Sequence, residues 1–269
     1  MNLAQMSASA AVMIAAILVL RWAAKHRLPK RTFSALWGVA LLRLTVPFSA
    51  PSPLSVYALL ARLRAPGESA AAHAGLPAGQ GSHIALLLPA AQPQAARPSL
   101  WIGLWAAGAV LCALYFAVAY IRCRMRFASA RPVENAYAAA FLAEKKMKRQ
   151  VALRQSARLP APLSYGVLHP VILMPEGTDW ADTACLRFVL QHEYVHIRRF
   201  DGVAKLLLAA ALAVHWFNPF VWIMYVLDNR DIELACDEAV VRSFGAKARS
   251  AYALALIGME EKKAHLCPW

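Results

Sequence analysis

The sequence predicts a mainly α-helical membrane protein, with three transmembrane helices and a cytoplasmic α+β domain that contains a small β-sheet. Apolar residues make up 59 % of the 269 residues and charged residues only 16 %, whereas roughly a quarter of the residues in globular domains are charged. Three long, nearly uncharged runs lie in the first half of the chain. Short apolar segments between glycines and prolines follow in the second half, a pattern typical of short strands.

The three uncharged runs occupy residues 1–20, 32–48 and 100–121. The first and third contain no charged side chain, and the second contains only Arg43. Each is close to the ~20 residues that cross a bilayer as a helix, so we expect three transmembrane spans. A cleaved signal peptide is the alternative interpretation of the first run, but no charged region precedes it and no clear small-residue cleavage site follows it.

The distribution of basic residues predicts the orientation of the spans. Five Lys or Arg residues lie between positions 21 and 31 and eight between 122 and 149, but only three between 50 and 98. The positive-inside rule places the N-terminus and the loop 50–98 outside the cell. We therefore expect a multi-pass protein of the bacterial inner or plasma membrane, with a membrane region at 1–122 and a cytoplasmic domain at 123–269.

The strongly basic composition fits this topology. The formal net charge is +14, with 29 Lys and Arg against 15 Asp and Glu. Such a balance suits a nucleic acid or an anionic membrane surface. Because the basic residues gather beside the spans, we interpret them as topology signals and expect the lipid bilayer as partner, with no direct nucleic-acid contact. The five cysteines form no pair with metal-ligand spacing, so we expect free thiols and no disulfide framework.

The cytoplasmic part begins with a helical pattern and continues with strands. Residues 123–150 are rich in Ala and Lys and favour a helix, whereas 151–154, 163–167 and 171–174 are predicted to be short strands. Helical periodicity then begins near Asp182 and runs through Cys185, Val189, His192 and His196. Together these patterns predict an α+β domain.

The motif His192-Glu193-Tyr194-Val195-His196 lies on that helix. Positions i and i+4 share one helix face, so His192 and His196 could bind one zinc ion. Glu193 lies beside them and could take a proton from water as it attacks a peptide carbonyl. The spacing therefore predicts Zn²⁺ as cofactor and Glu193 as the catalytic base of a metallopeptidase. Two histidines on an amphipathic helix without any metal are the alternative.

A zinc site with two histidines needs a third protein ligand. Glu233 and Asp237 lie at i and i+4 on a predicted helix, and Glu238 follows directly. One carboxylate could bind the metal while another orients a ligand imidazole, and spacing alone does not assign these roles. His215 is predicted to be a packed residue, because helix geometry carries it well away from His196.

Residues 206–227 separate the two clusters and carry no charge. A single span there would place His196 and Glu233 on opposite sides of the membrane. The dipeptide Asn218-Pro219 interrupts the run, and proline breaks a helix and biases the preceding residue away from helix. We therefore predict a membrane-associated hairpin of two short helices, which keeps both clusters on the cytoplasmic side and packs on the motif helix or enters the membrane.

Several segments together resemble the membrane peptidase domain of the BlaR/MecR family of β-lactam-sensing antirepressors. The resemblance covers essentially the whole chain, and the order and spacing of the segments are specific. The segments are Leu41-Leu42-Arg43-Leu44 with Pro47, Gly166 to Pro175, His192 to Asp201, Trp216-Phe217-Asn218-Pro219 and Glu233-Leu234-Ala235-Cys236-Asp237.

The resemblance implies a gluzincin-type zinc protease. It implies that His192, His196 and Glu233 bind the zinc ion, that Glu193 is the general base and that Asp237 orients a histidine ligand. It also implies that the strand segment 166–175 lies beside the active-site cleft, where an edge strand could hold an extended substrate by strand addition.

One departure concerns the sensor. The family's sensors carry a fourth span and an extracellular penicillin-binding domain after the protease, and neither follows residue 261 here. The loop 50–98 also contains no Ser-x-x-Lys motif. We therefore expect a peptidase domain without the sensor domain, either a short family member or a truncated product, and do not expect β-lactam sensing by this chain alone.

The resulting functional hypothesis is an endopeptidase at the cytoplasmic membrane face. By resemblance, its substrate would be a transcriptional repressor, its own chain, or both, which would make it part of signal transduction. The alternatives are a non-catalytic transmembrane transducer that keeps the fold, and a quality-control protease with broad substrates. The sequence leaves a homo-oligomer open.

Overall fold

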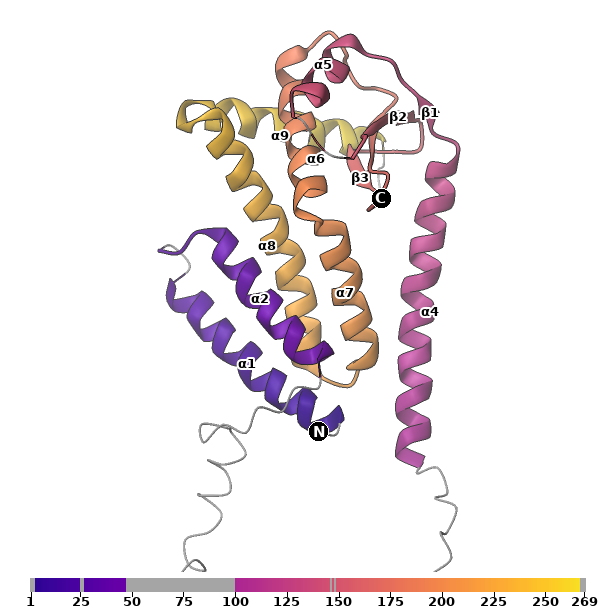
Figure 1. Cartoon of the computed structure of the whole chain (residues 1–269), viewed down its shortest axis with the longest axis vertical. Helices are drawn as coiled ribbons and strands as arrows, with labels where there is room; N and C mark the ends of the chain where they lie inside the picture. Colours follow the sequence, from indigo (N-terminus) through magenta and orange to yellow (C-terminus); the bar gives the residue numbers. More distant parts are fainter. Residues whose placement is uncertain (1–2, 25–26, 47–99, 146, 148, 267–269) are drawn as a thin grey trace, which may run out of the picture.

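The computed structural model describes residues 3–24, 27–46, 100–145, 147 and 149–266, so the predicted outer loop 50–98 lies outside the described residues. The helices, labelled as in Figure 1, are α1 Leu3–Ala24, α2 Lys30–Thr45, α4 Leu100–Ala128, α5 Ala136–Glu144, α6 Thr183–Arg199, α7 Asp201–Val214, α8 Pro219–Phe244 and α9 Arg249–Leu266, with a 3₁₀ turn η1 at Ala246–Ala248. The strands are β1 Arg131–Pro132, β2 Ala152–Ser156, β3 Leu163–Tyr165 and β4 Val171–Pro175.

Two of the described helices are long and apolar enough to cross a membrane. They are α1 and the segment Leu100–Met125 of α4, each with a mean hydropathy of 2.1. Helix α2 has 16 residues and so rises only ~24 Å, less than the ~30 Å of a bilayer core. The predicted span 32–48 is therefore not confirmed, and its last residues, 47–48, lie outside the described part. Helix α4 continues seven residues past the predicted end of its span, because 122–128 contains neither glycine nor proline.

Helices α1, α2, α7 and α8 pack around one apolar core, and α4 lies alongside α7 (Figure 1). Side chains that are almost completely buried come from all four helices of this core. They include Ile14 of α1, Trp37 of α2, Leu208 and Leu212 of α7, and Met224 of α8. The predicted hairpin corresponds to α7 and the first part of α8, which pack together inside this helix bundle.

The break predicted at Asn218-Pro219 is present. Helix α7 ends at Val214, and Pro219 is the first residue of α8, where the missing N–H of proline costs nothing. The Asn218 side chain caps α8 by accepting a hydrogen bond from the backbone N–H of Phe220 at 3.0 Å. The prediction of two short helices was wrong for the second one. Helix α8 has 26 residues and continues through the carboxylates, since no further helix breaker precedes Gly245.

The tip of the hairpin contacts the ends of three helices that the predicted topology places outside. The Asn218 side chain donates hydrogen bonds to the carbonyl and hydroxyl oxygens of Ser7 in α1, at 3.1 and 2.8 Å. His215 Nε2 lies 3.2 Å from the Leu44 carbonyl oxygen of α2, and the Trp105 indole of α4 donates to the last carbonyl of α7 at 2.9 Å. His215 is 1 % exposed, which confirms the prediction of a packed histidine.

Within the described part of the chain, the strands form a four-stranded sheet in the order β1-β2-β4-β3. Strands β2 and β4 are parallel, and the outer pairs are antiparallel. The three predicted strands correspond to β2, β3 and β4 within one or two residues. The continuous helix expected over 123–150 was wrong, because Pro132 falls in the short strand β1 and Asn135 starts α5 by capping Ala138 N–H at 2.9 Å.

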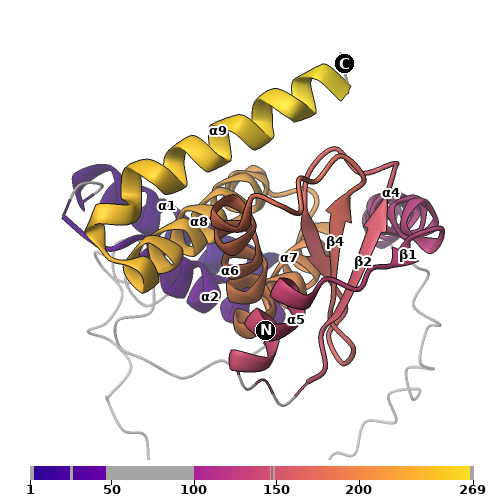
Figure 2. The same ribbon diagram turned by 90° about the horizontal axis from the view of Figure 1, so that it is seen from above.

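One face of this sheet packs on α6. Ile172 and Met174 of β4 share a buried cluster with Leu186 and Leu190 of α6 and with Phe141 of α5. Seen from above, α6 therefore lies between the sheet and α8 (Figure 2). This packing fixes the motif helix between the β-sheet and the bundle.

Candidate metal centre

Helix α6 carries both motif histidines. Asp182 starts the helix as predicted, because its carboxylate accepts the backbone N–H of Cys185 at 2.9 Å. The helix ends at Phe200, whose left-handed conformation (φ 59°) turns the chain directly into α7. Since α6 is held by the sheet on one side and by α8 on another, its histidines have a fixed environment.

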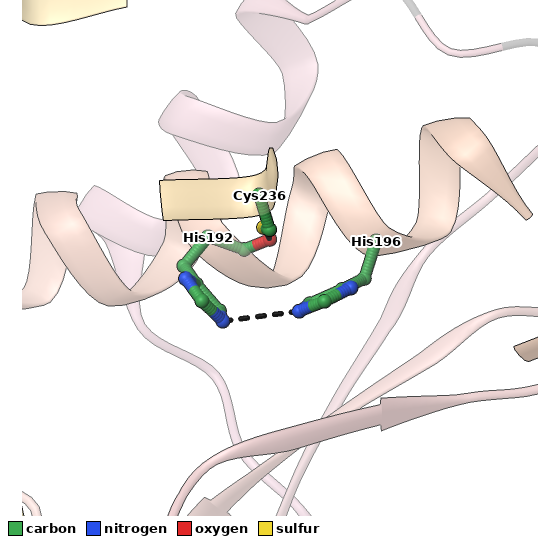
Figure 3. Close-up of side chains that lie close together, drawn as sticks. All are labelled: His192, His196 and Cys236. Carbon is green, nitrogen blue, oxygen red and sulfur yellow. Dashed lines mark hydrogen bonds between the residues drawn. The ribbon is translucent and has the colours of Figure 1, made fainter. Parts of the chain in front are cut away.

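The two ligand-type nitrogens face one another and Glu233. The Nε2 atoms of His192 and His196 are 3.0 Å apart (Figure 3). Glu233 Oε2 lies 3.7 Å from the first nitrogen and 3.4 Å from the second. Tetrahedral zinc with bonds of ~2.1 Å separates its ligand atoms by roughly 3.4 Å. These three atoms therefore have the separations that one tetrahedral ion requires.

The other nitrogen of each ring carries a proton. His196 Nδ1 lies 2.7 Å from Asp201 Oδ2, and an ionised carboxylate only accepts hydrogen bonds. His192 Nδ1 lies 2.9 Å from the hydroxyl of Tyr252, which donates its own proton to Asp237 at 2.7 Å. The hydroxyl must therefore accept from His192. With its outer nitrogen protonated, each ring can present an Nε2 lone pair to a metal ion at the centre, which is the tautomer that a metal ligand needs.

The charges around the pair favour a cation between them. Burial lowers the pKa of both imidazoles, but hydrogen bonds to carboxylates outweigh it and raise the pKa of His196 to about 11 and that of His192 further. Burial likewise raises the pKa of Glu233, but hydrogen bonds with the two histidines and Lys205 hold it well below its ordinary value. A metal ion fits this centre, and without one a proton can take its place.

Lys205 of α7 orients Glu233. Its ammonium group donates to Glu233 Oε1 at 2.8 Å, which leaves Oε2 toward the histidines. The Glu233 side chain is 47 % exposed, so solvent reaches the centre from this side. Catalytic zinc sites keep such an open position for water or substrate.

Cys236 offers a second candidate for the third ligand. The ligand atoms of His192, His196 and Cys236 all lie within 4.8 Å of one another, and in Figure 3 the sulfur lies beside the backbone carbonyl oxygen of His192. Its Sγ donates to the His192 carbonyl at 3.4 Å. Burial raises the pKa of this thiol, but the imidazoles outweigh it and hold the pKa below its ordinary value. Cys236 is free, as expected of the cysteines, but its place beside the histidines was missed.

The remaining acidic candidates lie in different places. Asp237 faces the outer nitrogen of His192, with Oδ1 3.4 Å from Nδ1. Glu238 points away from the histidines, since it accepts the backbone N–H of Lys30 at 2.9 Å and pairs with Arg242 at 3.0 Å. Glu193 is 5 % exposed, and no hydrogen bond or ion pair engages its carboxylate within the described part of the chain.

Sequence reasoning missed four contributors to this centre: Asp201, Lys205, Cys236 and Tyr252. Cys236 could have been found from its position, since it lies three residues after Glu233 and so near the same helix face. Lys205 and Tyr252 carry no local signal, because α7 and α9 meet the site only in the folded chain.

Comparison with known proteins shows which proteins the chain is similar to. A family model described as BlaR1 peptidase M56 matches residues 1–267. The regulatory protein BlaR1 of Bacillus licheniformis is 29 % identical over 109 residues, which are 40 % of this chain and 18 % of that protein. The methicillin resistance mecR1 proteins of Staphylococcus aureus and Staphylococcus epidermidis are 23 % identical over 145 residues, or 52 % of this chain and 24 % of theirs. The chain thus matches only about a fifth to a quarter of the length of these relatives.

Proposed function

The chain belongs to the BlaR1 peptidase M56 family of metallopeptidases, and on this premise we propose that it is an integral-membrane zinc endopeptidase. The observation that carries the proposal is the convergence of His192 Nε2, His196 Nε2 and Glu233 Oε2 at separations of 3.0 to 3.7 Å. A structural metal site is less suitable, because Glu233 is half-exposed and the centre is open on that side.

The proposed roles follow from position. His192, His196 and Glu233 would hold the ion, which supplies a Lewis acid for the peptide carbonyl and makes water more acidic. Glu193 would take the proton from the attacking water on one carboxylate oxygen and deliver it to the leaving amine nitrogen. Asp237 would act through Tyr252 to keep His192 in the Nε2 lone-pair tautomer.

A protein substrate would bind beside the sheet. The resemblance pointed to the segment 166–175, but β4 within it is an inner strand, paired on both sides. Among the described strands, β3 is the edge strand next to α6, and it pairs only with β4. A substrate in extended form could add to β3 through main-chain hydrogen bonds. By resemblance, we propose a transcriptional repressor or the chain itself as substrate.

The proposed topology places the N-terminus outside and residues 123–269 in the cytoplasm. Helices α1 and α4 would cross the bilayer, and α2 would complete a third span in contact with α1 and α8. The hairpin of α7 and the first half of α8 would then enter the membrane from the cytoplasmic side. Its apolar exposed side chains, such as Leu207, Trp222 and Val226, suit a lipid environment.

The first experiment measures bound zinc in the detergent-purified protein by mass spectrometry. We expect about one zinc per chain in the wild type, and loss in both His196→Ala and Glu233→Ala. Cys236→Ser is the matched control on α8 and should retain zinc. Retention in Glu233→Ala with loss in Cys236→Ser would move the third ligand to the thiol.

The second experiment separates the peptidase from a non-catalytic transducer. Glu193→Gln should keep its zinc but stop cleavage of the chain itself and of the repressor encoded nearest to it, followed by mass spectrometry of the fragments. If Glu193→Gln binds zinc and cells that carry it still show the signalling response of the wild type, this would favour the non-catalytic transducer. Absence of zinc from the wild type, even after supplementation, would contradict the peptidase.

A further inference from the structure

A groove of about 680 Å³ runs along α4 where this helix meets the β-sheet domain. One wall is the face of α4 that carries Leu111, Leu114 and Val118. The other wall is the connection between β2 and β3, together with Leu163 of β3. At the cytoplasmic end, Phe127 belongs to the buried cluster that joins α4 to the sheet. The volume is within the roughly 300–1,000 Å³ of small-molecule sites.

The length of the apolar wall matches one leaflet of a bilayer. From Leu111 to Arg122 the helix advances about 16 Å, at ~1.5 Å per residue. Half of the ~30 Å hydrocarbon core is about 15 Å. Arg122 is the first charged residue after the apolar run 100–121. If α4 crosses the membrane as proposed, the apolar wall covers the inner leaflet, and Arg122 lies at the level of the lipid head groups.

The charged end of the groove has no counter-charge. Arg122 of α4 and Arg158 of the β2–β3 connection both line it, and both residues are exposed. Within the described residues, no hydrogen bond or ion pair engages either guanidinium group, and no carboxylate is among the lining residues. Two arginines at the end of an apolar slot are complementary to one phosphate with an attached hydrocarbon chain.

We propose that this groove binds an anionic phospholipid of the inner leaflet. The phosphate lies between Arg122 and Arg158, and one acyl chain follows α4 past Val118 and Leu114 to the middle of the bilayer. The bound lipid bridges α4 and the connection that leads into β3. It thereby fixes the sheet, and with it the edge beside α6, relative to the membrane. The proposal depends on the proposed crossing of the bilayer by α4 and is independent of peptidase activity.

Native mass spectrometry of the full chain in mild detergent tests the proposal. The probes are dioleoyl phosphatidylglycerol and dioleoyl phosphatidylcholine, which share their chains and differ in net charge. We expect the protein to retain phosphatidylglycerol more tightly than phosphatidylcholine. Arg122→Gln with Arg158→Gln should weaken this retention roughly 10- to 30-fold, since each basic residue near an anionic lipid contributes about a factor of five. Ala119→Trp fills the groove without changing charge and should weaken retention of both lipids.

The matched control is Arg27→Gln with Arg31→Gln, which removes two charges at the same predicted membrane surface but outside the groove. Equal weakening in both double variants would overturn the proposal in favour of general surface charge. Unchanged retention in the groove variants would also overturn it, and so would displacement of the lipid by glycerol phosphate at equal concentration. Circular dichroism checks that each variant folds.

A separate measurement tests the topology. Release of the wild type from membranes by alkaline carbonate would contradict the crossing by α4, whereas the lipid titration tests the groove itself. The two failures are therefore distinguishable, and neither depends on whether the protein cleaves a substrate.

Discussion

The orientation of His192 depends on a tyrosine that lies 60 residues further along the chain. Tyr252 of α9 is 3 % exposed, and its hydroxyl joins the outer nitrogen of His192 to Asp237. His196 uses a shorter route, since Asp201 follows it by five residues at the start of the next helix. Each proposed ligand imidazole therefore has its own carboxylate, and this pattern is common around metal-bound histidines.

Removal of the Tyr252 hydroxyl should weaken zinc binding. In Tyr252→Phe, the outer nitrogen of His192 loses its hydrogen bond to the hydroxyl and Asp237 loses a donor, so we expect roughly 10- to 100-fold weaker zinc affinity. Competition with a chelator of known affinity measures this. Tyr137→Phe is the control, because the Tyr137 hydroxyl makes no hydrogen bond among the described residues and the ring packs beside α6. Equal affinity in both variants would contradict the role assigned to Tyr252.

Zinc binding should release a proton at pH 7.5. Without metal, the two Nε2 atoms 3.0 Å apart share one proton, and the pKa of His196 is raised to about 11. Since the raised pKa keeps that proton bound at pH 7.5, it must leave when the ion enters. The apparent zinc affinity should consequently rise about tenfold per pH unit between pH 6 and 9. Calorimetry in buffers of different ionisation enthalpy counts the protons, and a value near zero at pH 7.5 would contradict the shared proton.

At the scale of elements, α8 carries acidic residues on two faces with different partners. Glu233 and Asp237 lie toward the histidines of α6. Asp231 instead pairs with Arg21 at the end of α1 and accepts the Trp37 indole N–H of α2 at 2.9 Å. The first two helices are thus attached to the same α8 turns that hold the proposed metal ligand.

Loss of the partner of Asp231 should destabilise the protein. The Asp231 side chain is completely buried, so Arg21→Met would leave a buried carboxylate without an opposite charge, at a cost of about 3 kcal/mol or more. Arg242→Met on the same α8 is the control. It breaks an exposed pair with Glu238 and should cost about 0.5 kcal/mol or less. Unfolding in mixed micelles measures both, and similar small losses would show that the Arg21 pair contributes little.

At the scale of the whole molecule, the hairpin connects the proposed outer side to the metal centre. Its tip contacts α1, α2 and α4, while its other end carries Asp201, Lys205 and Glu233. The approach of α4 to the tip depends on Gly108, since a Cβ there would overlap the Trp216 ring. The Trp216 indole in turn donates to the Trp105 carbonyl at 3.2 Å.

A methyl group at Gly108 should disturb this contact. Gly108→Ala would force Trp216 or α4 to move, with a cost of about 1–3 kcal/mol. Gly103→Ala on the same helix is the control, because nothing lies within 4 Å of its Cβ, and it should be neutral or stabilising by up to ~1 kcal/mol. Thermal unfolding in detergent compares them. Equal melting temperatures would show that α4 does not pack closely on the hairpin.

Local sequence signals predicted most elements near the centre. The helix start near Asp182, the spacing of His192 and His196, and the break at Pro219 each depend on residues within one helical turn, so they act in the same way wherever the segment lies. The strands β2, β3 and β4 were predicted for the same reason, because their apolar residues lie between prolines and glycines.

Local spacing did not distinguish among Glu233, Asp237 and Glu238, whereas the tertiary structure shows which of them faces the histidines. All three lie within two turns of α8, and sequence spacing cannot say which face of one helix meets another. The packing of α8 between α6 and the first two helices turns Glu233 toward the histidines and Glu238 toward Lys30. The same packing brings in Lys205 and Tyr252. The sequence by itself therefore determined which chemistry the chain carries, through local spacing. The folded chain decided which side chains lie together at the candidate metal centre, because contacts between distant helices depend on packing and not on sequence spacing.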